Sequence, residues 1–357
     1  MKLDGVRVLD LTRFLPGPWV GLAMADHGAE VIKVEGPEGE PSRRVGPKIQ
    51  GHTAYFRNTQ RGKKSVVLDL KSDAGREACL ALAREADVVL ESFRPGVVDR
   101  LGIGYDTVKA INPRVVYCAL TAFGQTGEFA QRPTHDAGAQ ALIGTLSLTH
   151  PKPTLPNVPT CDIALGTLGL AAVAMALFRR EKTGRGDYID LAMTDALLSW
   201  IPHELGAPLV EGRAADVAQD RLHGGSALYN LYETKDGGHI VLAGAELHFA
   251  ENLLKALGRP DLVDLCRRPP GAGQEPVKAF LREAFLTKTR DEWDAWLADK
   301  GVCYGPVLDL HEAWNLPMWR ERGMILRGED GVEHVGTPIR FLEEPGQPRS
   351  ALPGNGV

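Results

Sequence analysis

The residues best suited to chemistry are an imidazole and two carboxylates in the middle of the chain. His135 and Asp136 stand together at the start of a predicted helix of small residues, and Asp162 stands at the start of a long apolar helix. The first turn of a helix has unpaired N–H groups, and the helix dipole favours negative charge there. An ionised carboxylate in that place suits a base or a nucleophile, and an imidazole supplies a second acid–base group. We therefore predict catalytic chemistry at His135, Asp136 and Asp162.

Each of these residues also has a structural interpretation. Asp is among the preferred N-cap residues, so Asp162 is equally typical of a carboxylate that caps its own helix. A lone histidine such as His135 is more often a hydrogen-bonded structural residue than a catalyst. Glu246, in the stretch GAELHF, is a third candidate, although an acid in the first turn of a helix is also stabilised by the dipole. The spacing does not show whether these groups meet in space.

A second group of candidates is basic. The loop from residue 36 to 59 is longer than an average connection and rich in Gly, Pro and Arg. Such cations bind phosphate groups, and arginine makes bidentate contacts to them. A solvated basic surface explains the same composition. The basic residues in and just after this loop are Arg43, Arg44, Lys48, Arg57, Arg61, Lys63 and Lys64.

Composition excludes several other classes of function. The chain has 357 residues, 43% hydrophobic and 24% charged, and a net charge of −5 without a basic stripe, so we expect no nucleic-acid partner. The five cysteines are scattered and lack metal-ligand spacing, so we expect reduced thiols, no metal and a cytoplasmic location. The first turn reads LPGPWVG instead of GxGxxG, so we expect neither NAD nor FAD. The stretch Ile163–Phe178 carries glycines and is short for a bilayer, so we expect no membrane contact.

Strands and helices alternate through the first part of the chain. This alternation predicts an α/β fold with a large, parallel-sheet, Rossmann-like domain over residues 1–210, to which residues 325–357 return. Its predicted strands are Val6–Leu11, Val31–Val34, Ser65–Leu70, Val88–Glu91, Val115–Leu120 and Tyr188–Leu191, and its predicted helices include Trp19–His27, Asp73–Glu85 and Ile163–Glu181.

Residues 211–324 predict a smaller α+β domain. Ala227–Tyr232 and His239–Ala243 flank the turn signal TKDG and should form a hairpin. Three amphipathic helices follow, the last with Thr289 as its N-cap. A last strand is expected within Val332–Phe341.

At these segments the chain resembles the family III CoA transferases, also called the CaiB/BaiF type, which include the α-methylacyl-CoA racemases. The family-like segments are LDGVRVLDLTRFLPGPW, GAEVIKVEGPEG, RGKKSVVLDLK, DVVLESFRPGVVDRLGIGYD, NPRVVYCALTAFGQTG and EKTGRGDYIDLAMTDALL. The resemblance implies an interlocked homodimer. It also implies that CoA binds between the large domain of one subunit and the small domain of the other.

The resemblance gives the candidate residues two sets of roles. In the transferases the position of Asp162 holds the nucleophile that forms anhydride and thioester intermediates, and in the racemases the same position holds one of two α-proton bases. HDAGAQALIG matches the His-Asp pair that supplies the second racemase base, whereas many transferases have Tyr at His135. Glu246 also resembles a racemase residue. The glycine-rich loop and the Gln of the formyl and oxalyl transferases are missing, with Leu15 at the Gln position.

The resemblance also concerns the CoA phosphates. Gly36 occupies the place of a CoA-phosphate arginine, so Arg43 or Arg44 is expected to replace it. Arg94 and Arg100 match basic positions of the family, and Arg61, Lys63 and Lys64 resemble its nucleotide-side segment. The stretches VIKVEGPEGEPSRR and AYFRNTQRGKKS look more like the transferase branch than the racemase branch.

Our first hypothesis is epimerisation of 2-methyl-branched acyl-CoA thioesters without a cofactor beyond the substrate's own CoA. His135 and Asp162 would then exchange the α-proton, Asp136 would orient His135, and Glu246 would support the His135 side. The alternative is CoA transfer between carboxylic acids through an Asp162 anhydride and an enzyme-CoA thioester. A third possibility is an acyl-CoA-binding protein that has lost its chemistry.

Overall fold

The computed structural model describes residues 1–149 and 152–354, which form two compact units. The large unit comprises Met1–Ile143, Pro156–Ile201 and Pro317–Val357, and the small unit comprises Gly144–Leu155 and Pro202–Leu316. The chain thus changes unit after residues 201 and 316, where the sequence led us to expect changes after 210 and 324. The short excursion Gly144–Leu155 has no counterpart in our prediction, because its composition is that of an ordinary loop.

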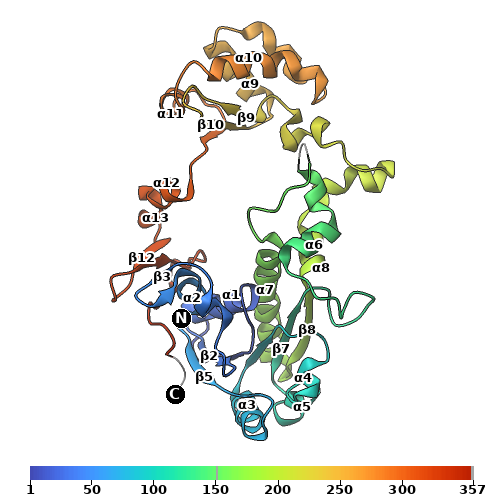
Figure 1. Ribbon diagram of the computed structural model, residues 1–357, viewed down its shortest axis with the longest axis vertical. Helices are drawn as coiled ribbons and strands as arrows, with labels where there is room; N and C mark the ends of the chain where they lie inside the picture. The colour runs from blue at the N-terminus through green and yellow to red at the C-terminus, as the bar shows by residue number, and fades with distance from the viewer. Residues whose placement is uncertain (150–151, 355–357) are drawn as a thin grey trace. The chain divides into compact units, whose positions relative to one another are not determined.

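A six-stranded parallel sheet forms the centre of the large unit (Figure 1), as the alternating pattern predicts. Its order is β5-β2-β1-β6-β7-β8. The chain therefore turns to one side after β1 and to the other side at β6, which leaves a crevice where the carboxyl ends of β1 and β6 lie. The strands are β1 (Arg7–Asp10), β2 (Glu30–Glu35), β5 (Lys64–Val67), β6 (Val88–Glu91), β7 (Val116–Thr121) and β8 (Asp187–Ala192).

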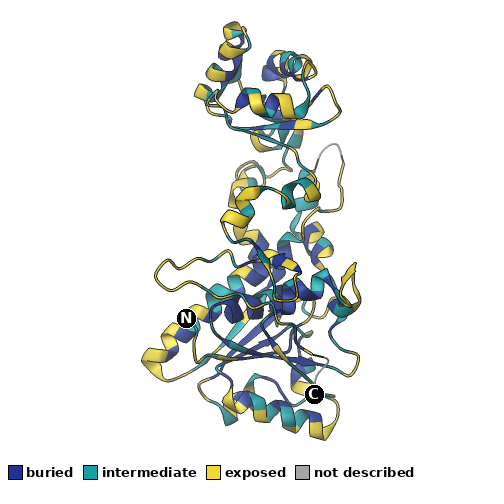
Figure 2. Ribbon diagram, turned by 90° about the vertical axis from the view of Figure 1, so that its left-hand side faces the viewer, coloured by how far each residue is buried: buried dark blue, intermediate teal, exposed yellow. Residues whose placement is uncertain are grey.

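Helices cover both faces of this sheet, because successive strand residues point to opposite sides. In β1, Val8 packs toward α1, α6, α7 and α8, whereas Leu9 packs toward α3 and α5. Figure 2 shows the buried residues concentrated on these strands and on the inner faces of the helices. The helices are α1 (Pro16–Asp26), α3 (Asp73–Glu85), α5 (Tyr105–Ile111), α6 (Asp136–Ile143), α7 (Thr160–Thr183) and α8 (Met193–Trp200). Shorter elements of the large unit are β3 (Lys48–Ile49), β4 (His52–Thr53), α2 (Ala54–Gln60) and α4 (Val97–Arg100).

Helices α1 and α7 have other bounds than we predicted. Helix α1 begins at Pro16 rather than Trp19, because proline is well tolerated in the first turn, where its missing N–H has no partner to lose. Helix α7 spans Thr160–Thr183 rather than Ile163–Glu181. Its 24 residues make it long and apolar enough to cross a bilayer, by length and composition only. It nevertheless packs against α1, α8 and β7, and Gly166 keeps it close to α1, since a Cβ there would lie 3.1 Å from the Pro16 carbonyl oxygen.

The small unit has its own antiparallel sheet and its own core. The turn TKDG joins β9 (Tyr229–Glu233) to β10 (His239–Ala243), and β11 (Tyr304–Pro306) pairs with β10, so the predicted hairpin is confirmed. The Thr289 cap is also confirmed as part of a capping box with Glu292. Trp293 and Phe285 are buried in the core of this unit. Its helices are α9 (Leu247–Ala256), α10 (Glu275–Phe285), α11 (Arg290–Leu297) and α12 (Leu310–Trp314), with short helical turns between residues 202 and 225.

The C-terminal segment returns to the large unit. It contains α13 (Pro317–Glu321), β12 (Ile325–Arg327) and β13 (Glu333–Val335), so the strand we expected within Val332–Phe341 is only three residues long. Two hydrogen bonds of 2.8 Å attach this segment to the rest of the large unit. Gln347 N donates to the carbonyl of Asp26, at the end of α1, and Gly62 N, just after α2, donates to the carbonyl of Ala351. The large unit is therefore complete only when both ends of the chain are in place.

Candidate active site

A cavity of about 420 Å³ opens in the crevice at the carboxyl ends of β1, β6 and β7. Asp162 and His135 both line it, so the structure brings together the two groups that the sequence singled out. We call this the reactive cavity. Its other lining residues include Arg13 and Phe14 after β1, Ser92 to Pro95 after β6, Ala122 after β7, and Arg132 to Thr134 before α6.

Asp162 is the third residue of α7 and lies on the wall of the cavity. Burial raises the pKa of its carboxyl to about 7, and repulsion by the nearby Asp136 adds to the increase. The helix N-terminus works in the opposite direction, because its dipole favours the carboxylate. A carboxyl group with a pKa near neutrality, oriented by a rigid helix, is suited to act as a nucleophile or a base.

Asp136 has a structural role that the sequence did not reveal. Its Oδ1 accepts hydrogen bonds from the backbone N–H groups of Cys161 (2.7 Å) and Asp162 (3.1 Å), and its Oδ2 accepts one from Gln140 (2.6 Å). The side chain that caps the start of α7 is therefore that of Asp136, a residue of α6, and Asp162 does not cap its own helix. This cap fixes the backbone of Asp162 and places a second negative charge beside it.

His135 is solvent-exposed, and its ring stands edge-to-face against Phe14, with 5.7 Å between centroids and 82° between planes. Within residues 1–149 and 152–354, the structure shows no hydrogen bond to either ring nitrogen of His135. Our expectation that Asp136 orients His135 does not match this geometry, because both Asp136 oxygens are engaged at the start of α7 and by Gln140. Phe14 is the aromatic ring that the imidazole contacts.

A second cavity, of about 430 Å³, lies beside the first and shares Arg13 and Phe93 with it. Three cations, Arg13, Arg44 and Lys71, line it together with two carboxylates, Glu38 and Asp69, so the lining carries a small excess of positive charge. A Cβ on Gly36 would lie 3.9 Å from Nη2 of Arg13, so the Arg13 guanidinium lies close to the place where a side chain at 36 would begin. We call this the basic cavity. Sequence reasoning missed Arg13 and Lys71, although Arg13 follows the first strand almost directly, a place where parallel sheets commonly put binding residues.

Several basic residues that we predicted to bind CoA already have partners within the large unit. Arg61 is buried and bound by both oxygens of Asp26, and Lys63 is buried between Asp10 and Gln60. Burial lowers the pKa of Lys63 to about 8, although the negative charge of Asp10 acts in the opposite direction and favours the protonated amine. Both charges are thus already paired within the large unit, which makes Arg61 and Lys63 weaker candidates for CoA ligands than the sequence suggested.

The other predicted basic residues are distributed differently. Arg43 forms an ion pair with Glu35 and lies over the Phe56 ring, so Arg44 rather than Arg43 faces the basic cavity. Lys64 is exposed and paired with Glu30. Arg94 lines the reactive cavity, whereas Arg100 is exposed at the end of α4 and lines neither cavity.

Glu246 belongs to the small unit, where it is exposed at the N-cap position of α9. Tyr55, which the sequence analysis missed, lies close enough to Asp162 and Glu40 for their charges to raise the pKa of its phenol beyond the effect of burial. Among the described residues, no three His, Cys, Asp or Glu side chains are grouped so that they could hold a metal ion.

Comparison with known proteins settles the family. The family model described as "CoA-transferase family III" matches residues 3–357 of the chain. The chain belongs to this family of enzymes. This family III protein is 34% identical to an acetyl-CoA:oxalate CoA-transferase from Acetobacter aceti, over 97% of its own length and 92% of the relative's. It is 32% identical to the human succinyl-CoA:glutarate CoA-transferase, over 92% of its own length and 76% of the relative's.

The solved structures agree with this assignment. A CAIB/BAIF family protein from Brucella suis superposes with a TM-score of 0.87 at 34% identity, and the match covers 99% of this chain and 96% of that one. The names of both sequence relatives describe CoA transfer. They therefore favour our alternative hypothesis, CoA transfer, over the epimerisation that we placed first.

Proposed function

We propose that this family III enzyme transfers CoA between two carboxylic acids, with Asp162 as the nucleophile. The observation that carries the proposal is the carboxyl of Asp162, whose pKa is raised to about 7 and which lies on the wall of a cavity that three arginines also line. Because the partly buried carboxylate is poorly solvated, it is a stronger nucleophile than a carboxylate in water.

The steps are acyl exchanges on the Asp162 carboxyl. A carboxylate oxygen of Asp162 attacks the donor thioester, the C–S bond breaks, and a mixed anhydride and CoA thiolate form. The thiolate attacks the Asp162 carbonyl, which releases the donor acid and leaves CoA on Asp162 as a thioester. The acceptor carboxylate then attacks the thioester carbonyl of Asp162, the C–S bond breaks, and a second anhydride and CoA thiolate form. The thiolate attacks the acceptor carbonyl of this anhydride, which gives the acceptor thioester and releases the Asp162 carboxylate.

We propose the basic cavity as the place of the CoA phosphates. Arg13, Arg44 and Lys71 supply the positive charge there, and Arg13 also lines the reactive cavity. A molecule of CoA bound in this way would direct its thiol toward Asp162. In this arrangement Arg13 replaces the arginine that the family resemblance led us to expect at Gly36.

The charge of the reactive cavity suggests the class of acid. Arg13, Arg94 and Arg132 line it, and Asp162 is the only carboxylate among its described lining residues. A guanidinium beyond those that serve the CoA phosphates would bind a second carboxylate, with bidentate geometry. Short dicarboxylic acids are therefore the acids we propose, in line with the oxalate and glutarate in the names of the relatives.

The test is to trap the thioester. The enzyme incubated with an acyl-CoA and treated with borohydride should carry a reduced side chain at position 162, and treatment with hydroxylamine should leave a hydroxamate there. Peptide mass spectrometry locates the modification, and Asp162→Asn should show none. Transfer at a normal rate without a trappable adduct at Asp162 would refute the mechanism.

Epimerisation remains the second candidate, because His135 lines the same cavity as Asp162. In this reaction one group removes the α-proton of the thioester and the other returns it from the opposite face. Incubation of 2-methylacyl-CoA in D2O measures this chemistry directly. Deuterium uptake that disappears in His135→Ala would support it, whereas exchange unaffected by that change would remove His135 from the mechanism.

A further inference from the structure

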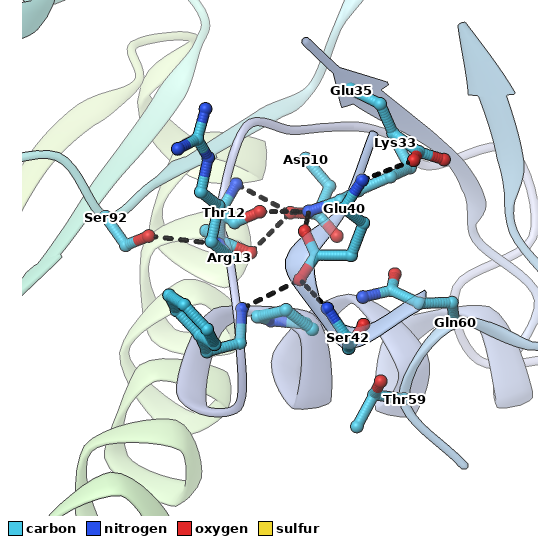
Figure 3. A network of polar contacts seen from close by, with 12 residues as sticks. Asp10, Thr12, Arg13, Lys33, Glu35, Glu40, Ser42, Thr59, Gln60 and Ser92 are labelled. Carbon is cyan, nitrogen blue, oxygen red and sulfur yellow. Dashed lines mark hydrogen bonds and ion pairs between the residues drawn. The ribbon is translucent and has the colours of Figure 1, made fainter. Parts of the chain in front are cut away.

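The loop Thr12–Phe14 lies between the two cavities, and each of its three backbone N–H groups donates to a side chain outside the loop. Thr12 N donates to Asp10 Oδ1 at 3.0 Å, and Lys33 Nζ donates to the Thr12 carbonyl. Arg13 N donates to Ser92 Oγ at 3.1 Å (Figure 3). Phe14 N donates to Glu40 Oε1 at 3.0 Å. This loop carries both Arg13, which is shared by the two cavities, and Phe14, which contacts His135.

Phe14 has an unfavourable backbone conformation. Its φ is +63°, in the left-handed region, where a bulky side chain is rarely found. Strain of this kind persists only where the surrounding structure enforces it, and it is concentrated at functional sites. The side chain is also 39% exposed, so burial of the ring does not explain why the chain accepts the strain.

Glu40 is the residue that holds this conformation. It is only 2% exposed, and its Oε2 lies 3.4 Å from Lys33 Nζ. Its backbone N–H donates to Glu35 Oε2 at 2.7 Å, so Glu40 is held at its backbone as well as at its carboxylate (Figure 3). The buried charges of this group balance, with Asp10 and Glu40 opposed by Lys33 and Lys63. Because this carboxylate is fixed, the Phe14 N–H can form its hydrogen bond to Glu40 in only one backbone position.

We propose that Glu40 is a positioning residue for the reactive cavity, which holds Phe14 so that its ring orients His135 and closes one wall of the acyl site. The inference rests on the proposed function in one respect, that the reactive cavity is where the acyl group reacts. Glu40 touches neither substrate nor the reacting atoms, and it acts only through the Phe14 backbone. The sequence gives no sign of this role, because Glu40 stands in a loop whose composition suggests a solvated surface.

Two variants separate the reach of the Glu40 side chain from its charge. Glu40→Asp keeps the charge opposite Lys33 but withdraws the oxygen from Phe14 N by one methylene. Glu40→Gln keeps the reach and an oxygen acceptor for Phe14 N but removes the charge. A positioning role predicts that Glu40→Asp disturbs the site more, whereas a purely structural ion-pair role predicts that Glu40→Gln does.

The first measurement is the imidazole Cε1–H resonance of His135 in protein with labelled histidine and without any substrate. Phe14→Leu removes the aromatic ring and gives the reference shift. Glu40→Asp should move the His135 resonance in the same direction as Phe14→Leu, and Glu40→Gln should leave it near its wild-type position. A resonance unmoved in Glu40→Asp, or moved equally in both Glu40 variants, would overturn the proposal.

The second measurement is turnover beside stability. Glu40→Asp should change the KM for the acid by about three- to tenfold, as expected for one lost hydrogen bond, while Glu40→Gln should lower the melting temperature more and the activity less. Activity losses that follow the loss of stability in both variants would show a structural role only. The imidazole measurement needs no turnover, so failure to trap an Asp162 thioester would refute the proposed function without deciding this proposal.

Discussion

Asp162 shows how one side chain combines two opposing influences. The start of α7 favours its negative charge, whereas burial and Asp136 oppose it, and the result is a pKa of about 7. The enzyme therefore keeps a carboxyl that is half protonated near neutral pH, in a place where the transferase mechanism needs the ionised form. Such a group lowers the stability of the fold, because the charged form is poorly solvated.

Asp162→Asn should therefore stabilise the protein while it abolishes transfer. The pKa of Asp162 is raised in the folded state above its ordinary 3.8, so the folded state holds a proton that the unfolded state loses between about pH 4 and pH 7. The free energy of unfolding therefore falls as the pH rises through that window, and the destabilisation by Asp162 reaches its full size above about pH 7. We expect the variant to melt at least about 2–4 °C higher at pH 8, the shift that about 1 kcal/mol produces in a chain of this size, and at the wild-type temperature below pH 4. Thermal melts across this range measure the difference, and equal melting at pH 8 would contradict it.

Arg13 is the residue whose loss should weaken acyl-CoA binding. Arg13→Gln removes a cation from both cavities, and hydrogen bonds to charged groups are worth enough to raise the KM for acyl-CoA about ten- to a hundredfold. Steady-state kinetics should show a smaller effect on kcat. Arg114→Gln is the matched control, because Arg114 is exposed just before β7, at the end remote from the strand's carboxyl terminus. An equal change of KM in the two variants would contradict the assignment.

At the scale of elements, local patterns predicted the strands and helices well but not the contacts between them. The buried apolar strand Val88–Glu91 and the helical spacing in Asp73–Glu85 give those elements with the bounds the structure has. The partners of charged residues come from distant segments. Arg61 and Lys63 look like free phosphate ligands because nothing nearby in sequence indicates that Asp26 and Asp10 neutralise them. For the same reason the cap that α6 gives to α7 could not be predicted.

The contact between α6 and α7 can be tested with two changes at Asp136. Asp136→Asn keeps an oxygen acceptor for the N–H groups of Cys161 and Asp162 but removes the charge that raises the pKa of Asp162. The acidic limb of the pH profile of transfer should then move to lower pH, with little loss of stability. Asp136→Ala also removes the cap and should lower the free energy of unfolding by about 1 kcal/mol. An acidic limb that stays in place in Asp136→Asn would show that Asp136 does not affect the titration.

At the scale of the whole molecule, the large unit depends on its C-terminal segment. Deletion of residues 337–357 removes the partners of Asp26 O and Gly62 N and the contact of Glu344 with Lys2. At about 1 kcal/mol for each hydrogen bond, the large unit should lose a few kcal/mol of stability. Calorimetry should show a lower transition for the large unit and an unchanged one for the small unit, whose core is separate. A single transition identical to that of the intact chain would contradict this dependence.

The interlocked homodimer and the cytoplasmic location stay predictions. Met175 and Phe178 of α7 are 68% and 66% exposed on this chain, whereas Val173 and Leu177 of the same helix are buried in the core. A second subunit that covered them would bury this surface. Sedimentation analysis of the intact protein measures the oligomeric state directly.

The return of the C-terminal segment has a consequence for biosynthesis. Residues 202–316, which make up nearly all of the small unit, leave the ribosome as one continuous stretch, whereas the large unit must wait for the strand that brings Val335 to Asn58 and for Ala351 to reach Gly62. A nascent chain usually acquires structure from its beginning onward. For this chain we expect the part synthesised in the middle to fold first, and the part that starts the chain to reach its native state last.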